Sequence, residues 1–167
     1  SVEQEHQRLL KFDRQLNEFP FERLNAETKI DFQILRAAIK EELFGFEATE
    51  RFTRNPMTYP RALGFGTYLN RAWAPLPHRV KSIIAIQKKL PALFAAARQN
   101  LKKPLPRAFV ETAIQVTNGA GDFLEKEMPA ALATLEDKAL LAEFTTSNQA
   151  AVRELREYVR WLETEQL

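Results

Sequence analysis

Hydrophobic residues recur every three or four positions along nearly the whole chain, a spacing that is typical of α-helices. No segment of four or more residues alternates cleanly between apolar and polar positions, so strands are not expected. A first helix is predicted to end near Glu18, because Pro20 blocks its continuation. A second helix is predicted from the N-cap Asn25 to about Thr49. Its expected buried face comprises Phe32, Leu35, Ile39, Leu43 and Phe46.

Prolines divide the middle of the chain into shorter segments. The Asn55-Pro56 pair disfavours helix, so a loop is predicted from Arg51 to Met57. A third helix is predicted from Tyr59 to Ala74, with Pro60 tolerated in its first turn. Further helical segments are predicted from Pro77 to Lys89 and from Ala92 to Leu101, before Pro104 and Pro106 break the chain again.

The last third of the chain predicts two long helices. The helix after Pro106 carries two neighbouring apolar stripes, so it is expected to lie at the centre of the bundle. The first stripe is Phe109, Ala113, Val116, Ala120 and Phe123, and the second is Val110, Ile114, Thr117, Gly121, Leu124 and Met128. Gly119 and Gly121 are interpreted as close-packing positions. The final helix begins at the N-cap Asp137, with a stripe of Leu141, Phe144, Asn148, Ala151, Leu155, Tyr158 and Leu162.

These patterns predict an all-α protein, an irregular bundle of about six helices. A length of 167 residues suits a single helical domain, or part of a larger one. No apolar run approaches the roughly 20 residues of a membrane-spanning helix. The chain begins at Ser1 rather than Met, and its last residues are still helical in pattern. Both ends therefore look cut from something longer, in which case apolar surface is expected to be exposed around Trp161 and Leu162.

Charge is strongly segregated along the sequence. Residues 51–110 contain twelve Lys and Arg and no Asp or Glu, whereas the first fifty residues hold seven basic and eleven acidic side chains and the last fifty-seven hold five and eleven. Such a basic block can attract an acidic partner. It can also be neutralised internally if the acidic ends fold back on it, with Glu41, Glu42, Glu47 and Glu50 as the nearest partners upstream.

Aromatic residues are interleaved with the cations of this block, a mixture that can bind single-stranded nucleic acid. The basic members are Arg51, Arg54, Arg61, Arg71, Arg79 and Lys81, and the aromatic ones are Phe52, Tyr59, Phe65, Tyr68 and Trp73. The pI of 8.9 is below the range of a dedicated nucleic-acid domain. Nucleic acid is therefore the least favoured partner, behind a small acidic ligand or peptide terminus. The favoured interpretation is that the aromatics fill the core while the cations coat the surface or pair with Glu from neighbouring helices.

The sequence offers little catalytic chemistry. The two histidines, His6 and His78, have no partner at the spacing of a zinc-hydrolase helix. There is no Cys, and no Ser lies in a Gly-x-Ser-x-Gly turn. Gly64-Phe65-Gly66 is only a fragment of a dinucleotide fingerprint and is interpreted as two small residues inside a packed helix. No catalytic and no metal-ligating residue is therefore predicted in this chain.

An ordered set of short motifs gives a family resemblance. The motifs are Arg54-Asn55-Pro56-Met57-Thr58-Tyr59, Ala74-Pro75-Leu76 followed by Arg79, Leu90-Pro91-Ala92-Leu93, Ala97-Arg98-Gln99-Asn100-Leu101 and Phe109-Val110-Glu111-Thr112-Ala113-Ile114. In this order and spacing they resemble the N-terminal half of the bacterial DUF885 family, over about Thr28 to Leu162. Members of that family are much longer, mostly helical, and similar to zinc metallopeptidases of the gluzincin type.

The resemblance implies a division of labour within a longer protein. The family's His-Glu-x-x-His-like motif lies in its C-terminal half and is absent here, so zinc is possible only in that missing part. The N-terminal part of such peptidases forms one wall of a deep cleft. This implies substrate-binding roles for Arg54, Asn55, Tyr59, Tyr68 and Arg71, with Arg54 and Arg71 at a concave rim as the best candidates to hold a carboxylate.

Two functions follow from these observations. The first is the N-terminal lobe of a DUF885-type zinc metallopeptidase, a helical scaffold and substrate-cleft portion whose partners are the C-terminal part of the same protein and a peptide substrate. The alternative is a free-standing helical interaction module that binds an acidic partner through its basic middle segment. Either is compatible with the bacterial cytoplasm or with the periplasm or secretion.

Overall fold

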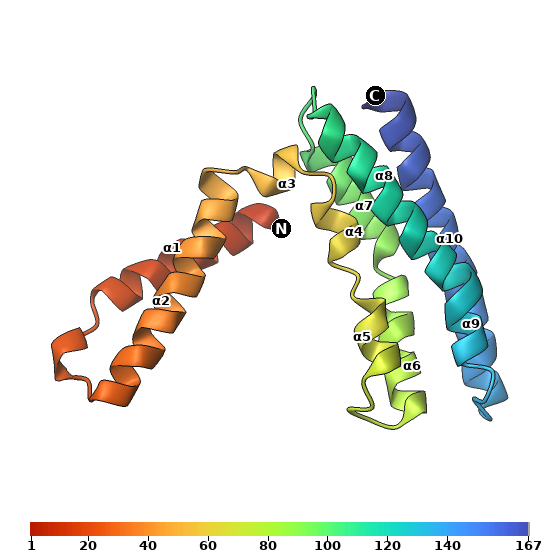
Figure 1. Cartoon of the computed structure of the whole chain (residues 1–167), viewed down its shortest axis with the longest axis horizontal. Helices are drawn as coiled ribbons and strands as arrows, with labels where there is room; N and C mark the ends of the chain where they lie inside the picture. Colours follow the sequence, from red (N-terminus) through yellow and green to blue (C-terminus); the bar gives the residue numbers. More distant parts are fainter. Residues whose placement is uncertain (167) are drawn as a thin grey trace. The chain divides into compact units, whose positions relative to one another are not determined.

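All regular elements in the computed structural model, which describes residues 1–166, are helices (Figure 1). The predicted all-α class is confirmed, and the six longest helices are α1, α2, α6, α7, α8 and α10. The sequence predicts a single domain or part of one; the chain contains two compact units, Ser1–Phe52 and Thr53–Leu167. Each has its own apolar cluster and is described by itself.

The first unit is a hairpin of α1 (Val2–Asn17) and α2 (Ala26–Glu47), joined through the 3₁₀ turn η1 (Phe21–Arg23). The predicted cap is present, because the Asn25 side chain accepts a hydrogen bond from the backbone N–H of Thr28 at 2.9 Å. Such a bond satisfies one of the free N–H groups of the first helical turn. The first two predicted helices are therefore confirmed, together with their ends.

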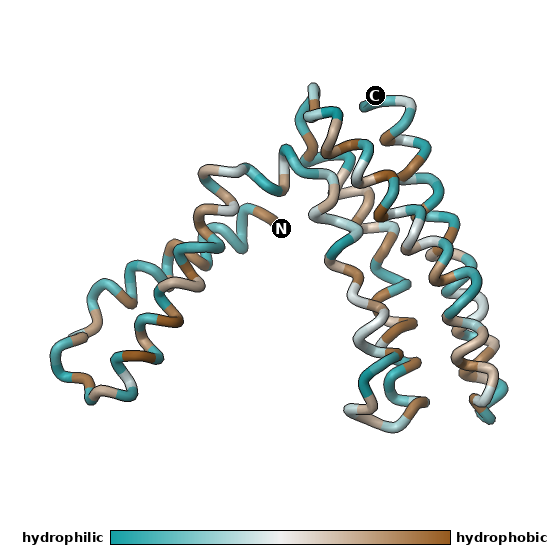
Figure 2. The backbone as a smooth tube through the Cα atoms, in the orientation of Figure 1, coloured by the Kyte–Doolittle hydropathy of each residue, from teal (hydrophilic) through white to brown (hydrophobic). Residues whose placement is uncertain are grey.

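The buried face of α2 is narrower than predicted. Ile39 and Leu43 are buried with Leu9 of α1, and Phe46 packs against this cluster. Leu35, predicted to be buried, is 51% exposed. The physical reason is that α2 has one helix packed against it in this unit, and one helix covers only one side of another. Figure 2 shows hydrophobic positions distributed along the whole of α2.

The segment between residues 51 and 74 is more broken than predicted. The expected loop from Arg51 contains a short helix, α3 (Arg51–Arg54), and the expected single helix from Tyr59 is two short ones, α4 (Thr58–Arg61) and α5 (Phe65–Asn70). Gly64 separates them with a φ of +53°. This left-handed conformation ends a helix and is cheap only for glycine. The interpretation of Gly64 as a helix-interior residue is therefore wrong.

The second unit is organised around its last helix. Its remaining elements are α6 (Leu76–Gln87), α7 (Leu90–Asn100), α8 (Arg107–Asp122), the π-helix η2 (Phe123–Glu127), α9 (Met128–Ala131) and α10 (Lys138–Glu165). The central helix is α10, which packs against α6, α7 and α8 (Figure 1). The prediction that α8 is central is wrong, because its first stripe is only partly buried and Phe109 is 40% exposed.

The stripe predicted along the final helix forms the core of this unit. Asp137 caps α10 by accepting a hydrogen bond from the Leu140 N–H at 3.0 Å. Tyr158 is fully buried, stacks on Phe94 with ring centroids 4.5 Å apart, and donates its hydroxyl to the carbonyl of Pro56 at 3.1 Å. Leu162 is also fully buried, and Trp161 is partly buried against the same core cluster. The expectation that these two residues expose apolar surface is therefore wrong.

The two glycines of α8 differ in their surroundings. A Cβ on Gly121 would lie 3.1 Å from the Arg156 guanidinium carbon, whereas a Cβ on Gly119 would meet nothing within 4 Å. The prediction of close packing is therefore confirmed at Gly121 and is wrong at Gly119. Within residues 1–166, no helix has both the length and the apolar character that crossing a membrane requires.

Candidate functional site

The five residues implied by the family resemblance are held by two different parts of the second unit. Tyr59 lies in α4, which packs against α7 and α8. It is 4% exposed, its hydroxyl accepts a hydrogen bond from the Asn100 amide at 3.3 Å, and burial raises its pKa. In this chain Tyr59 is thus a core residue with a satisfied hydroxyl.

Asn55 and Arg54 precede α4. The Asn55 side chain accepts a hydrogen bond from the Met57 N–H at 3.0 Å, and its carbonyl accepts one from the Thr58 N–H at 3.1 Å. Asparagine often shapes a turn in this way by bonding to the backbone two residues on. Asn55 therefore positions the start of α4, and Arg54 beside it is exposed.

Tyr68 and Arg71 belong to α5 and to the connection that follows it, next to α6. The Tyr68 ring packs edge-on against Trp73 with centroids 5.9 Å apart. Arg79 of α6 donates to the carbonyls of Tyr68, Leu69 and Ala74 at 2.8–3.0 Å. Arg79, a cation of the basic block, therefore stabilises the α5–α6 connection. Arg71 is exposed.

Tyr59 and Tyr68 therefore lie on different helices. The expectation that Arg54 and Arg71 hold a carboxylate stays a prediction.

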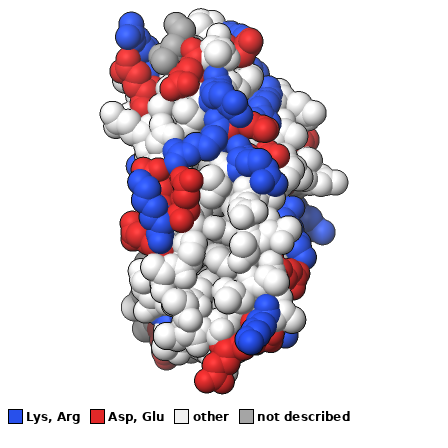
Figure 3. Space-filling model, turned by 90° about the vertical axis from the view of Figure 1, so that its right-hand side faces the viewer, with Lys and Arg blue, Asp and Glu red and all other residues white. Residues whose placement is uncertain are grey.

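Part of the basic block is neutralised by the acidic ends of the chain. Lys88 pairs with Glu143 at 2.6 Å and Lys103 pairs with Glu165 at 2.8 Å, both across to α10. Of the partners named from the sequence, Glu42 pairs with Arg51, whereas Glu47 contacts His6. Figure 3 shows Lys and Arg next to Asp and Glu in the upper part of one face, above a largely uncharged area.

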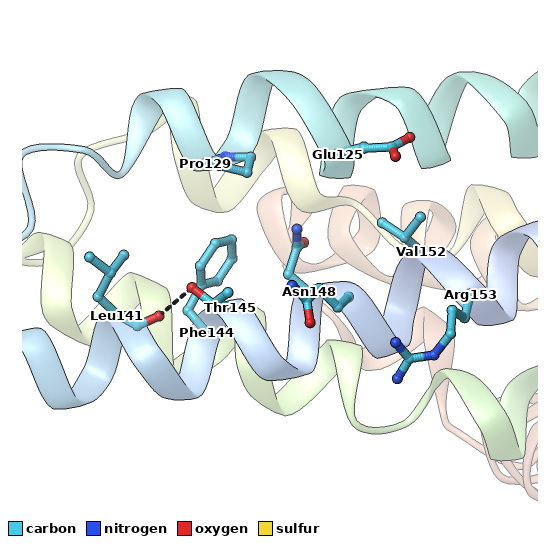
Figure 4. Close-up of a pocket in the computed structure, with 9 residues that line it drawn as sticks. Glu125, Pro129, Leu141, Phe144, Thr145, Asn148, Val152 and Arg153 are labelled. Atoms are coloured by element: carbon cyan, nitrogen blue, oxygen red, sulfur yellow. Dashed lines mark hydrogen bonds between the residues drawn. The ribbon is translucent and has the colours of Figure 1, made fainter.

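A cavity of about 420 Å³ opens between the η2–α9 segment and α10 (Figure 4). Its apolar lining consists of Pro129, Leu141, Phe144 and Val152. Its polar lining consists of Glu125, Thr145, Asn148, Gln149 and Arg153. Figure 4 shows Phe144, Asn148 and Val152 rising from α10 toward Pro129 and Glu125 on the opposite segment.

Next to the cavity the backbone hydrogen bonds change from the α-helical to the π-helical pattern. Pro129 explains why one carbonyl there lacks a backbone donor. In an α-helix the Leu124 carbonyl would accept the Met128 N–H, but that N–H donates to the Phe123 carbonyl, one residue further back. A π-type bond to Leu124 would need an N–H at position 129, and proline has none. The Leu124 carbonyl is therefore left without a backbone donor from either position, as happens in π-bulges.

A buried polar network satisfies this carbonyl. The Asn148 amide donates to the Leu124 carbonyl at 2.7 Å, and the Gln87 amide donates to the Asn148 side-chain oxygen at 2.8 Å. The Ser147 hydroxyl donates to the Gln87 side-chain oxygen at 2.5 Å. Gln87, Ser147 and Asn148 are all buried. Because buried polar groups cost free energy unless they are bonded, the network fixes η2, α6 and α10 in one arrangement.

Charged groups lie at one end of the cavity. Arg156 donates to Asn118 at 2.8 Å, to Asp122 at 2.5 Å and to Glu125 at 3.3 Å. The bonds to Asp122, first, and to Glu125 raise the pKa of Arg156, and the bond to Asp122 lowers the pKa of that carboxyl. In the part of the chain that the structure describes, Arg153 has no carboxylate within 4 Å. Figure 4 shows Arg153 and Glu125 toward the same end of the cavity, on opposite segments.

Sequence reasoning missed this site. Asn148 was assigned to an apolar stripe, although a polar residue at a core position signals a buried hydrogen bond. Pro129, after an uninterrupted helical pattern, was a second signal for an orphaned carbonyl. The sequence carries no comparable signal for Arg153, which is one of several exposed cations.

The described residues 1–166 contain no group of three or more His, Asp or Glu side chains placed to hold a metal ion.

The fold and the site define an all-α protein with a polar network beneath a mixed cavity. The family model described as "Bacterial protein of unknown function (DUF885)" matches residues 1–167, so the chain belongs to this family. A comparison with curated proteins found no match.

A solved structure of similar fold is described as "a putative lipoprotein of unknown function from Shewanella oneidensis". The TM-score is 0.82 at 24% identity, over 96% of this chain and 30% of the other. The chain thus spans less than a third of the length of that structure.

Proposed function

We propose that this chain is the N-terminal helical scaffold of a longer DUF885 protein and that it supplies part of the wall of a substrate-binding cleft. The zinc-dependent peptidase chemistry that the family resemblance implies would then rest on residues outside this chain. The proposal is supported by the match to 30% of the length of a solved structure of similar fold.

The observation that carries the proposal is a second apolar stripe on α2. Ile30, Ile34 and Phe44 are 58%, 64% and 60% exposed, and Ala37 between them is exposed too. Their spacing of four, three and seven residues places them on one face of the helix. The exposed Glu41 lies on the same face and interrupts the stripe between Ala37 and Phe44. Ile39 and Leu43, which pack with α1, lie on another face.

A helix that is apolar on two faces is typically buried between two layers. In the first unit α1 covers one of these faces, and the other is left open. Monomeric soluble proteins rarely expose continuous apolar patches above a few hundred Å². We infer that the remainder of a longer chain covers the open face of α2.

A cavity between α1 and α2 is a second place where the remainder of a longer chain could pack. It has a volume of about 410 Å³ and is lined mainly by apolar side chains of α1 and α2, including Phe12, Phe19 and Leu35. Phe12 and Phe19 are themselves about half exposed. Such a hollow can receive side chains from a further helix, as ridges pack into grooves between helices.

The competing function is a free-standing module that binds an acidic partner through residues 51–110. Arg79 holds backbone carbonyls, and Lys88 and Lys103 pair with glutamates of α10. These contacts use several cations of the block within the chain. They favour the scaffold over the module, for which the block would have to keep its cations available to a partner.

The test compares this chain with the product of its complete reading frame. We expect chain 1–167 alone to bind an apolar-surface dye and to self-associate, and the longer protein to protect α2 from hydrogen exchange. In chain 1–167, Ile34→Lys should reduce dye binding and association, while Ala38→Lys, at an exposed position off the stripe, should change neither. A reading frame that ends near Leu167, with a monomeric protein that binds no dye, would contradict the proposal.

A further inference from the structure

We propose that the open face of α2 is covered by a basic amphipathic helix, in which a central apolar residue is flanked, one heptad away on each side, by Lys or Arg. This inference rests on the proposed function, because we assign the covering helix to the remainder of the longer chain. It adds the chemistry of that helix, which the proposed function leaves open.

The open face of α2 follows a heptad pattern. Two rows of residues recur along it with a period of seven, and every member of both rows is exposed. The first row is Ile30, Ala37 and Phe44, and the second row is Glu27, Ile34 and Glu41. The steps between the two rows alternate between three and four residues, which is the spacing with which one helix packs along another. The expected occupant is therefore a helix.

Two carboxylates of the second row lack a cation. Glu42, on another face of α2, pairs with Arg51. Within residues 1–166, Glu27 and Glu41 have no basic group within 4 Å. They lie on either side of Ile34, each seven positions from it. The second row thus presents an apolar centre between two uncompensated negative charges.

A cover over this face would change the surroundings of these charges. In the open face, water solvates the Glu41 carboxylate. Beneath another helix, Glu41 would lie between Ala37 and Phe44 and would lose much of that water. A buried charge is costly without an opposite charge next to it. A stable cover therefore places a cation opposite Glu41, and the same argument applies to Glu27 at the other end of the row.

The cations of α2 do not supply this compensation. Lys29 pairs with Glu22 at 3.3 Å and Lys40 pairs with Asp13 at 2.9 Å. Arg36 lines a hollow together with residues of α1. None of these three cations belongs to either row of the open face. The compensating charges must come from the covering helix.

A second copy of the chain does not fit this face well. If two α2 helices packed in parallel, each residue of the second row would face its own equivalent, so that Glu41 would oppose Glu41. In an antiparallel pair the carboxylates would face the first row, which is apolar. Neither arrangement supplies a cation, because the two rows contain no Lys or Arg. Self-association of the isolated chain through this face should therefore be weak.

The experiment titrates chain 1–167 with two synthetic helical peptides of three heptads, by calorimetry and by amide shifts on α2. Both peptides have Leu throughout the first row and at the centre of the second, with Ala and Gln elsewhere. The two flanking positions of the second row are Lys in one peptide and Glu in the other. We expect the Lys peptide to bind at least about tenfold more tightly, because opposite-charge pairs replace like-charge pairs. The net charge of the chain is +2, so non-specific attraction would favour the Glu peptide.

A charge reversal locates the site. The double variant Glu27→Lys with Glu41→Lys should prefer the Glu peptide by about tenfold. The matched control, Glu3→Lys with Glu18→Lys, makes the same change in net charge at exposed positions outside both rows and should keep the preference for the Lys peptide. Equal binding of the two peptides by the parent chain, or the same reversal in both double variants, would overturn the proposal.

A second pair of variants tests the apolar centre. Ile34→Ser should weaken binding of the Lys peptide at least about tenfold, since the covered isoleucine side chain would be lost from the contact. Leu35 is exposed to a similar degree, 51% against 64% for Ile34, but lies outside both rows. Leu35→Ser should therefore weaken binding less than about threefold. Equal losses in the two variants, with both folded, would contradict a contact through this face.

The product of the complete reading frame separates this inference from the proposed function. Hydrogen exchange of α2 is compared in the parent protein and in the Glu27→Lys, Glu41→Lys variant. Protection that is lost in the variant supports both proposals. Protection that is equal in both proteins leaves the proposed function standing and refutes the basic covering helix. An unprotected α2 in the parent protein refutes the proposed function, and with it the assignment of the helix to the longer chain.

Discussion

The side-chain amide of Asn148 on α10 donates to the backbone carbonyl of Leu124 in the π-helix at a distance of 2.7 Å. Met128 and Pro129 cannot serve that carbonyl, because the N–H of Met128 is used by Phe123 and Pro129 has none. A side chain from another helix therefore replaces a backbone donor. The wall of the cavity and the packing of α10 depend on the same bond.

Removing this donor should destabilise the protein. Asn148→Ala leaves the Leu124 carbonyl and the Gln87 amide buried without their partner, and each such group costs about 1–3 kcal/mol. We expect a loss of about 2–4 kcal/mol in the free energy of unfolding, measured by urea denaturation. Gln149→Ala, at the exposed neighbouring position, should stay within about 0.5 kcal/mol of the parent protein.

A double-mutant cycle tests the network itself. Gln87→Ala and Asn148→Ala should cost less together than the sum of the two single changes, because each one already breaks the bond between them. Additive effects would show that the two side chains do not form one network. A loss below about 0.5 kcal/mol for Asn148→Ala would show that water or another donor satisfies Leu124.

Periodicity predicted where helices lie but not which polar side chains meet. The stripe from Leu141 to Leu162 is local information, and the structure confirms it as the core-facing side of α10. The partners of Asn148 are Gln87, 61 residues away, and Leu124, 24 residues away. A single sequence contains no signal for such distant pairing, so the network and the cavity it shapes could not be predicted.

A single sequence likewise does not show which faces of a helix are covered and which are exposed. The pattern of α2 shows apolar residues on two faces, and sequence reasoning chose Leu35 for the buried set. Which face is covered depends on what packs against the helix, and in this unit that is α1 alone. Likewise the substrate-facing role implied for Tyr59 rested on resemblance, whereas its burial in this chain depends on the packing of α4 on α7 and α8.

Gly64 should be sensitive to substitution because of its backbone conformation rather than its neighbours. Its φ is +53°, and a Cβ there would meet nothing within 4 Å. Gly64→Ala should therefore lower the free energy of unfolding by about 1–2 kcal/mol, the cost of the left-handed region for an L-residue. Gly64→Asn should cost less, since asparagine tolerates this region.

The control for Gly64 is Gly66, which lies within α5 and has ordinary space for a Cβ. Gly66→Ala should be neutral or stabilising by up to about 1 kcal/mol, as helix propensity predicts. Thermal unfolding followed by circular dichroism measures all three variants. Equal effects at both positions would mean that α4 and α5 are continuous in solution.

The paired glycines of α8 give a test of close packing. Gly119→Ala should stabilise the protein by about 0.5–1 kcal/mol, because the helix gains propensity and the new methyl group meets open space. At Gly121 the new methyl group would press on the Arg156 guanidinium at 3.1–3.4 Å. Gly121→Ala should therefore gain less or lose stability, measured by urea denaturation, and equal gains at both positions would contradict the packing.

The pair of Asp122 and Arg156 should make stability depend on acid pH. The hydrogen bond from Arg156 holds the pKa of Asp122 below its ordinary value of 3.8. A lowered folded-state pKa stabilises the fold above the pKa of the unfolded chain, and that contribution is lost as the pH falls through the lower folded-state value. An NMR titration of the Asp122 carboxyl carbon should therefore show a midpoint below 3.8.

Arg156→Gln should return that midpoint to near the ordinary value, because it removes the charged donor, and should weaken the acid dependence of unfolding. Glu165, whose pKa is lowered by Lys103, provides an internal reference that Arg156→Gln should not move. Added salt should reduce the shift of Asp122 in the parent protein, since the pair is exposed and screened. An unshifted Asp122 midpoint in the parent protein, with Glu165 shifted as described, would mean that Arg156 does not bond to Asp122 in solution.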